Sequence, residues 1–119
     1  MSNDTSKIIA EHNDRFRSYL GVPHFGEFEI KGKHLVTQGI HNLSPEDQIM
    51  IIAGVRNFKD FNQDNDPYGE HDFGKFSDNG HDIMWKIDYY DTQYEYGSPD
   101  PSDPAKTRRV LTVMLAHEY

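Results

Sequence analysis

The segment from Ile83 to Tyr90 places the strongest constraint on how this chain folds, because its hydrophobicity alternates with a period of two. Successive side chains of a β-strand point to opposite faces, so the pattern predicts a strand that is buried on one face. The expected buried face carries Ile83, Trp85, Ile87 and Tyr89, and the other carries Met84, Lys86, Asp88 and Tyr90. The preceding Asn79-Gly80 pair is a strong hairpin-turn signal and predicts that residues 71–76 pair with this strand.

The other segments complete an α+β domain of 119 residues. The expected elements are a helix at about 5–20, a hairpin at about 27–38, a helix at about 45–58, an acidic loop at 60–69, a β-meander at about 71–97, a Pro/Asp loop at 98–104 and a last element at about 107–117. We therefore expect a single domain over residues 1–119, an antiparallel β-sheet meander with two helices packed on one face.

Three details of this prediction depend on short segments. The hairpin is expected to bend at residues 31–33, where Gly32 lies between two lysines. Residues 93–96 are expected to add a last short strand to the meander. The apolar run near the C-terminus fits a strand or a helix, because a short apolar run does not separate the two.

Negative charge is concentrated in one part of the chain. The net charge is −8, with 20 acids and 12 Lys and Arg residues. Residues 60–103 hold twelve of the acids and two of the cations, a net charge of −10, whereas the remaining residues carry +2. Such a segment favours a basic protein surface or a cation as its complement, and a solvated acidic face that only aids solubility is the alternative.

Several classes of function are disfavoured by composition. Nucleic acid is not expected as a direct partner, because the acidic segment repels phosphates. The chain has no cysteine and no apolar run of membrane-spanning length, so thiol chemistry and a membrane are not expected. The first residues lack the apolar region of a signal peptide, which favours a cytoplasmic protein. No phosphate loop, dinucleotide fingerprint, nucleophile elbow or HExxH zinc motif is present, so an enzyme is the less favoured class and no catalytic residue is assigned.

Carboxylates and tyrosines of the acidic segment are the candidate partner-binding residues. Carboxylates at near-phosphate spacing suit Lys and Arg side chains, and the tyrosines supply apolar anchorage. The candidates are Asp64, Asp66, Glu70, Asp72, Asp88, Asp91, Asp100, Asp103, Tyr90 and Tyr94. The oligomeric state stays open between a monomer and a homodimer that pairs through an exposed strand.

A divalent cation is the alternative to an expectation of no cofactor. Residues 60–72 place oxygen-bearing side chains at alternate positions, as a calcium loop does. However, Asn65 stands at the sixth position and His71 at the twelfth, where an EF-hand has Gly and Glu, so an EF-hand is disfavoured. The candidate metal ligands are Asp64, Asp66, Glu70, His71 and Asp72, and a protein that binds metal through them, with hydrolysis as its chemistry, is the alternative function.

Four segments carry a resemblance to a known family. They are residues 68–74 (YGEHDFG), 85–91 (WKIDYYD), 97–104 (GSPDPSDP) and 109–119 (RVLTVMLAHEY). The chain resembles, from about Asn42 to Tyr119, a short single-domain bacterial family catalogued only as a domain of unknown function, with the motifs NDPxGEHDFG, WKIDYYD, YGSPDPxDP and RVLTxMLAxEY. The resemblance implies that Asp66, Glu70, His71, Asp72 and Asp88 lie in signature segments, and it implies no activity.

These observations lead to one functional hypothesis. Small proteins of this kind are often carried on plasmids and other mobile elements, which favours an antagonist of host defence. We expect a small acidic, non-enzymatic binding protein that docks a basic, nucleic-acid-binding surface of a host or defence protein. An anti-CRISPR or anti-restriction inhibitor fits this description.

Overall fold

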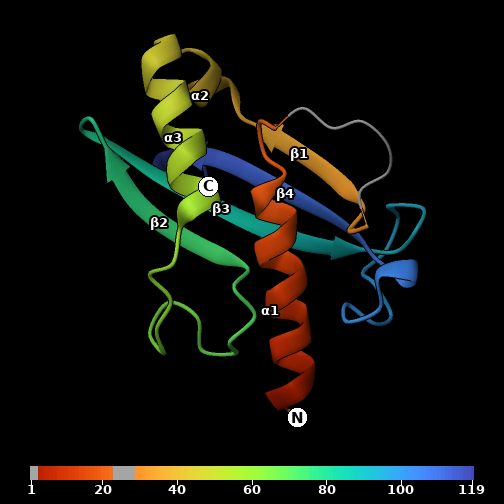
Figure 1. The fold of residues 1–119 in the computed structure, drawn as a ribbon. Helices are drawn as coiled ribbons and strands as arrows, with labels where there is room; N and C mark the ends of the chain where they lie inside the picture. The colour runs from red at the N-terminus through yellow and green to blue at the C-terminus, as the bar shows by residue number, and fades with distance from the viewer. Residues whose placement is uncertain (1–2, 23–28) are drawn as a thin grey trace.

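The computed structural model describes residues 3–22 and 29–119, and in these ranges the chain is α+β, as predicted (Figure 1). The elements in chain order are α1 (Asn3–Ser18), β1 (Gly32–Val36), α2 (Gln38–His41), α3 (Pro45–Asn57), β2 (Phe73–Asp78), β3 (His81–Tyr90), a 3-10 helix η1 (Pro104–Lys106), β4 (Arg108–Leu115) and a second 3-10 helix η2 (Ala116–Glu118). None of the described helices is long and apolar enough to cross a membrane.

The described strands form one mixed sheet in the order β1-β4-β3-β2. β2 and β3 are antiparallel and join at Asn79 and Gly80, whose φ angles of 48° and 82° are those of the expected hairpin turn. β3 and β4 are also antiparallel, but β1 runs parallel to β4. The expectation of a purely antiparallel sheet is therefore wrong at this one pair of strands.

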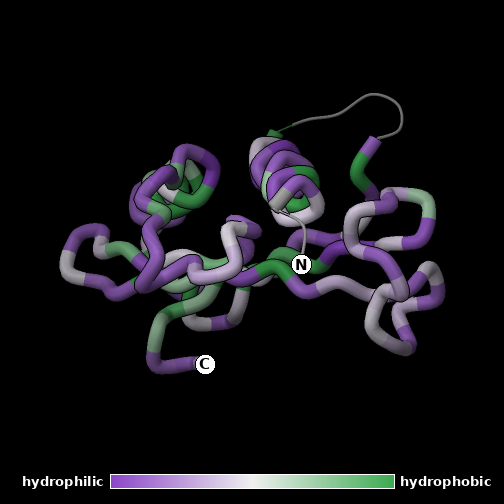
Figure 2. The backbone as a smooth tube through the Cα atoms, turned by 90° about the horizontal axis from the view of Figure 1, so that it is seen from below, coloured by the Kyte–Doolittle hydropathy of each residue, from purple (hydrophilic) through white to green (hydrophobic). Residues whose placement is uncertain are grey.

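Both long helices cover the same face of the sheet. Figure 2 shows α1 and α3 side by side on one side, whereas the C-terminus lies on the other side. Ser44 caps α3 as expected, since its hydroxyl accepts a hydrogen bond from the Asp47 N–H at 3.1 Å. The core beneath the helices is built from Phe16, Leu20, Ile30, Ile40, Ile51, Val55, Phe58, Ile83, Trp85, Ile87, Leu111 and Val113. The predicted buried face of β3 is thus confirmed, but the expectation that only one face is buried is wrong at Met84, which is 1% exposed.

The hairpin expected at about 27–38 is wrong where the structure describes it; residues 27 and 28 lie outside the described residues. Gly32 and Lys33 do not form a bend but begin β1, where Gly32 is the register partner of Arg109 in β4. A Cβ atom added at Gly32 would overlap the Arg109 carbonyl oxygen. This glycine therefore serves the close approach of two backbones, which local turn signals do not detect.

The last strand of the expected meander, at 93–96, is also wrong. Residues 91–97 form a turn in which the Asp91 carboxylate accepts hydrogen bonds from the Gln93 and Glu95 N–H groups. Only an isolated bridge joins Tyr90 to Gly97. β2 pairs with β3 only as far as Lys86, so the edge beside Tyr90 is open, but the turn at Asp91 uses residues 93–95 and brings only Gly97 and Ser98 back to that edge. The C-terminal run, left open between strand and helix, forms the strand β4.

Candidate functional site

A buried polar network lies at the end of the sheet where β3 stops and β4 begins. It connects α1 to the loop before β2 and to the loop between β3 and β4. Asn13, which is fully buried, donates from Nδ2 to the Glu70 carbonyl at 2.9 Å and to the Tyr89 hydroxyl at 2.8 Å. Its Oδ1 accepts a hydrogen bond of 2.6 Å from Nε of Arg109. The Tyr89 hydroxyl in turn donates to the Glu70 carboxylate at 2.9 Å. One amide therefore holds three separate segments in place.

Arg109 is a buried cation in this network. Its side chain is fully buried, lies 5.2 Å from the centre of the Tyr89 ring, and donates to the Pro101 carbonyl at 2.9 Å. Among the described residues no carboxylate lies within ion-pair distance of it. Burial lowers the pKa of Arg109, and the more distant Tyr89 and Glu70 groups oppose that shift. Neutral acceptors, Asn13 above all, stabilise this charge.

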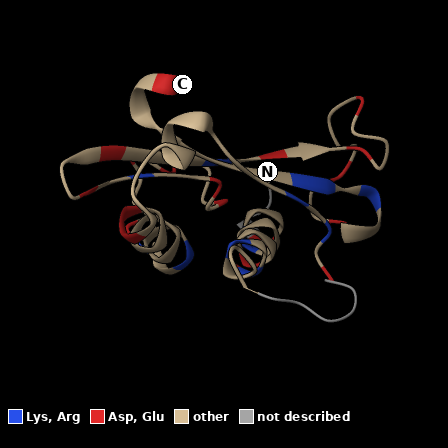
Figure 3. Ribbon diagram, turned by 90° about the horizontal axis from the view of Figure 1, so that it is seen from above, with Lys and Arg blue, Asp and Glu red and all other residues tan. Residues whose placement is uncertain are grey.

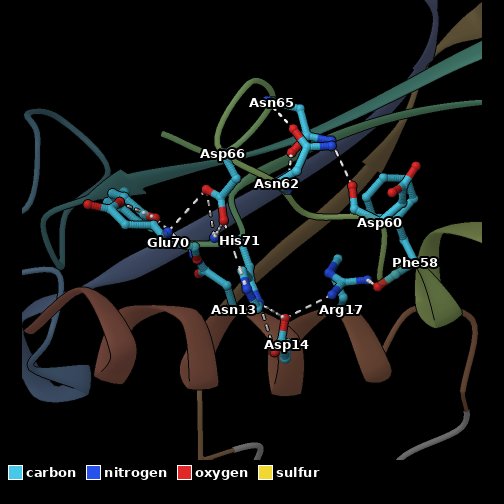
Figure 4. A network of polar contacts seen from close by, with 11 residues as sticks. Asn13, Asp14, Arg17, Phe58, Asp60, Asn62, Asn65, Asp66, Glu70 and His71 are labelled. Atoms are coloured by element: carbon cyan, nitrogen blue, oxygen red, sulfur yellow. Dashed lines mark hydrogen bonds and ion pairs between the residues drawn. The ribbon is translucent and has the colours of Figure 1, made fainter. Parts of the chain in front are cut away.

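Asp66 organises the loop that carries the expected site residues (Figure 4). It is 9% exposed, and its carboxylate accepts hydrogen bonds from the backbone N–H groups of Glu70 at 3.1 Å and His71 at 3.2 Å. His71 has a φ of 57°, a left-handed conformation that aims its N–H at this carboxylate. The Asn62 and Asn65 amides fix the earlier part of the loop through backbone hydrogen bonds.

His71 connects this loop to α1. Its Nδ1 lies 2.9 Å from Oδ1 of Asp14, and its Nε2 lies 3.9 Å from Oδ2 of Asp66. The Phe61 ring stacks on the imidazole at 3.9 Å between centroids. The same Asp14 carboxylate accepts a hydrogen bond of 2.8 Å from Arg17, so Figure 4 shows Asp14 between a guanidinium and an imidazole. These contacts hold the imidazole between α1 and the loop.

Four of the predicted carboxylates lie close enough for the other three to act electrostatically on Asp72, and we call them the acidic cluster: Asp66, Glu70, Asp72 and Asp88. Asp88 projects from the face of β3 opposite to Tyr89, which contacts Glu70. Burial raises the pKa of Asp72, and the negative charges of Glu70, Asp66 and Asp88 raise it further. Lys86 forms an ion pair with Asp88 on the neighbouring position of the same strand face. The cluster is therefore a place where like charges are held together and only partly neutralised.

The raised pKa of Asp72 predicts how stability depends on pH. Because the folded carboxyl binds its proton more tightly than the unfolded one, its charged form destabilises the fold at neutral pH. We expect the Asp72→Asn variant to be more stable than the parent at pH 7 by up to about 1 kcal/mol, after allowance for solvent screening. This advantage should shrink as the pH falls through the raised pKa toward the ordinary value of 3.8. Urea unfolding at several pH values measures it, and an advantage that does not change with pH would contradict the assignment.

The other predicted partner-binding residues lie in separate turns. Asp91, Asp100 and Asp103 accept hydrogen bonds from backbone N–H groups of their own loops. Hydrogen bonds from Ser102 lower the pKa of Asp100. Asp64 is exposed in the 60–69 loop. The Tyr90 and Tyr94 rings lie 6.4 Å apart, and the Lys33 ammonium lies 4.2 Å from the Tyr94 ring.

The cation alternative finds no preformed set of ligands in the described ranges. Within residues 3–22 and 29–119, no three His, Asp or Glu side chains are grouped so that they would hold a metal ion. Asn62 and Asp66, which fall on the alternate positions of the calcium-like pattern, use their oxygens on backbone N–H groups of the loop. These two side chains, which the spacing suggested as cation ligands, therefore stabilise the conformation of the loop itself.

Sequence reasoning missed the contribution of α1. Asn13, Asp14 and Arg17 all contact the site, and none was a candidate. The signal was present in the helix, because Asn13 and Arg17 lie four residues apart on the face that also buries Phe16. Arg109 lay in a run identified as apolar, and there no local signal marks it as a buried cation.

Comparison with known proteins identifies a family but no activity. The model of the family described as "Protein of unknown function (DUF3768)" matches residues 36–118, which run from the end of β1 to η2. No curated protein and no solved structure matches the chain. The whole of α1, including Asn13 and Arg17, therefore lies before the matched region although it completes the site. Since the match covers more than half of the sequence, this chain belongs to the DUF3768 family of proteins of unknown function.

Proposed function

We propose that this protein is a small acidic, non-enzymatic binding protein that docks a basic surface of another protein. The acidic cluster carries the proposal. Its carboxylates are held by the fold at the end of the sheet, and among the described residues Lys86 forms an ion pair with Asp88, whereas the imidazole Nε2 of His71 lies 3.9 Å from Asp66. Burial and the neighbouring negative charges raise the pKa of Asp72, and an approaching cation stabilises the charged form of this carboxyl. An incoming Arg or Lys side chain supplies that cation.

The proposed partner is a nucleic-acid-binding surface of a host or defence protein. Such surfaces present Lys and Arg side chains that otherwise hold phosphates, and a rigid group of carboxylates competes for them. Preorganisation by Asp66 and Asn13 supports this role, because a loop that is already ordered loses less entropy on binding. Inhibition of a CRISPR or restriction complex by a protein from a mobile element is the specific form that we propose.

A nine-residue polyarginine peptide provides a defined basic probe. We expect the Asp72→Asn, Asp88→Asn double variant to bind it at least about fivefold more weakly than the parent, because two charge-assisted contacts are lost. Binding should also weaken as salt is added, since the contact is electrostatic. Titration by calorimetry at two ionic strengths measures both effects.

The matched control removes two acids outside the cluster. The Glu11→Gln, Glu46→Gln variant has the same net charge as the test variant, and both positions are exposed on helices. We expect its affinity for the peptide to stay within about twofold of the parent. An equal loss in the two double variants would show that only net charge matters and would contradict the proposed site.

A further inference from the structure

A pocket of about 280 Å³ lies on the other side of the Asp14–His71 pair, between α1 and the end of α3. Its walls are Asp14, Arg17, Arg56, Phe58, Lys59, Phe61 and His71. Three of these side chains are permanent cations and one is an acid, so the pocket is positively charged in a chain whose net charge is −8. Figure 3 shows Lys and Arg segments on both long helices, beneath the sheet in that view.

Arg17 forms the fixed back wall of this pocket. Its side chain is 3% exposed, and its Nη1 donates to the carbonyls of Val55 at 2.6 Å and Phe58 at 3.1 Å. The guanidinium also lies 4.7 Å from the centre of the Trp85 ring. Its Nε is buried and has no hydrogen-bond partner among the described residues. Burial lowers the pKa of Arg17, and Asp14 opposes that shift. The Arg17 charge is thus held rigidly and is neutralised by one shared carboxylate.

Arg56 and Lys59 form the open side of the pocket. Both are exposed, and neither makes an ion pair with any other described residue. Two long cationic side chains are therefore free to close on a ligand that the fixed guanidinium already attracts. Asp14 is the acid closest to that ligand, but it is engaged by Arg17 and His71. Asp14 offsets one of the three positive charges that line the pocket, and the remaining positive charge suits a doubly charged anion.

The remaining walls indicate what such an anion is attached to. Phe58 and Phe61 contact each other edge to face at 5.1 Å, and Phe61 stacks on His71. An aromatic wall beside a cationic one suits a ligand with an apolar group next to its charge. The volume lies near the lower end for ligand sites, so the ligand is small. We propose that this pocket binds a small phosphate monoester that carries an apolar or aromatic group.

Titration with inorganic phosphate, phenyl phosphate and benzoate at constant ionic strength tests this proposal. Amide chemical shifts of residues 56–61 and 71 should move in a saturable way with both phosphates. We expect phenyl phosphate to bind at least about fivefold more tightly than inorganic phosphate, because its ring is buried against the aromatic wall. Benzoate should bind more weakly than phenyl phosphate, since it has one charge fewer.

Two double variants separate the pocket from net charge. In Arg56→Gln, Lys59→Gln we expect phenyl phosphate to bind at least about tenfold more weakly. The control Lys31→Gln, Lys106→Gln loses the same charge at exposed positions outside the pocket and should bind within about twofold of the parent. Equal losses in both variants, benzoate binding as tight as phenyl phosphate, or no saturable shift with either phosphate would overturn the proposal. None of these results depends on the polyarginine experiment, because the pocket and the acidic cluster are different sites.

Discussion

Replacement of Asn13 by alanine is expected to lower the free energy of unfolding by about 3–4 kcal/mol, the largest effect of any single polar substitution that we predict. The amide makes three buried hydrogen bonds, to the Glu70 carbonyl, the Tyr89 hydroxyl and Arg109. Alanine would leave the Arg109 guanidinium buried with the Pro101 carbonyl as its hydrogen-bond acceptor among the described residues. Denaturant unfolding followed by the fluorescence of Trp85 measures the loss.

A double-mutant cycle distinguishes this effect from a simple loss of packing. The Arg109→Met change removes the buried charge, so the Asn13→Ala, Arg109→Met variant should lose clearly less stability than the sum of the two single variants. Glu11→Ala, at an exposed position on the same helix, should change stability by no more than about 0.5 kcal/mol. Strict additivity of Asn13→Ala and Arg109→Met would show that the two side chains do not act as a unit.

Replacement of Gly32 by alanine is expected to cost about 3 kcal/mol or more. The added methyl group would overlap the carbonyl oxygen of Arg109 and would come within 2.7 Å of the Phe16 ring. Since one obstacle is backbone, β1 has to move away from β4, and the parallel pairing is weakened. The measurement is the midpoint of thermal unfolding together with amide hydrogen exchange of residues 33–36.

Gly97→Ala is the matched control for this substitution. Its added Cβ would lie 4.0 Å from the nearest obstacle, the Tyr89 carbonyl oxygen. We expect it to change stability by less than about 0.5 kcal/mol. If Gly32→Ala were tolerated equally well, the close contact between β1 and β4 would not be as tight as the structure shows.

Local patterns predicted most of the secondary structure because the forces behind them act over a few residues. The alternation in β3 predicted the buried face of the central strand, and Ser44-Pro45 marked the start of α3. β1 could not be placed in this way, because each of its residues pairs with a β4 residue 77 positions later in the sequence, as Gly32 does with Arg109. A glycine between two lysines suits a turn as well as a tight parallel contact, and only the tertiary structure distinguishes them.

The candidate site was predicted in part. The acidic segment contains the acidic cluster, but composition alone did not separate its four members from Asp91, Asp100 and Asp103, whose carboxylates stabilise their own turns. The cationic pocket was not predicted at all, because its side chains come from α1 and from the residues around the end of α3 and carry no common motif. Charge summed along the chain does not show where opposite charges are separated in space.

The parallel pairing of β1 with β4 has a consequence for the order in which the molecule is made. During synthesis α1 and β1 emerge well before β4, so β1 finds its neighbour in the sheet only after residues 108–115 have left the ribosome (Figure 1). Asn13 likewise lacks its hydrogen bond from Arg109 until that residue has been synthesised. The nascent chain therefore holds an unpaired strand and an incomplete core until β4 has emerged, and a truncation that removes β4 would leave β1 without its partner in the sheet.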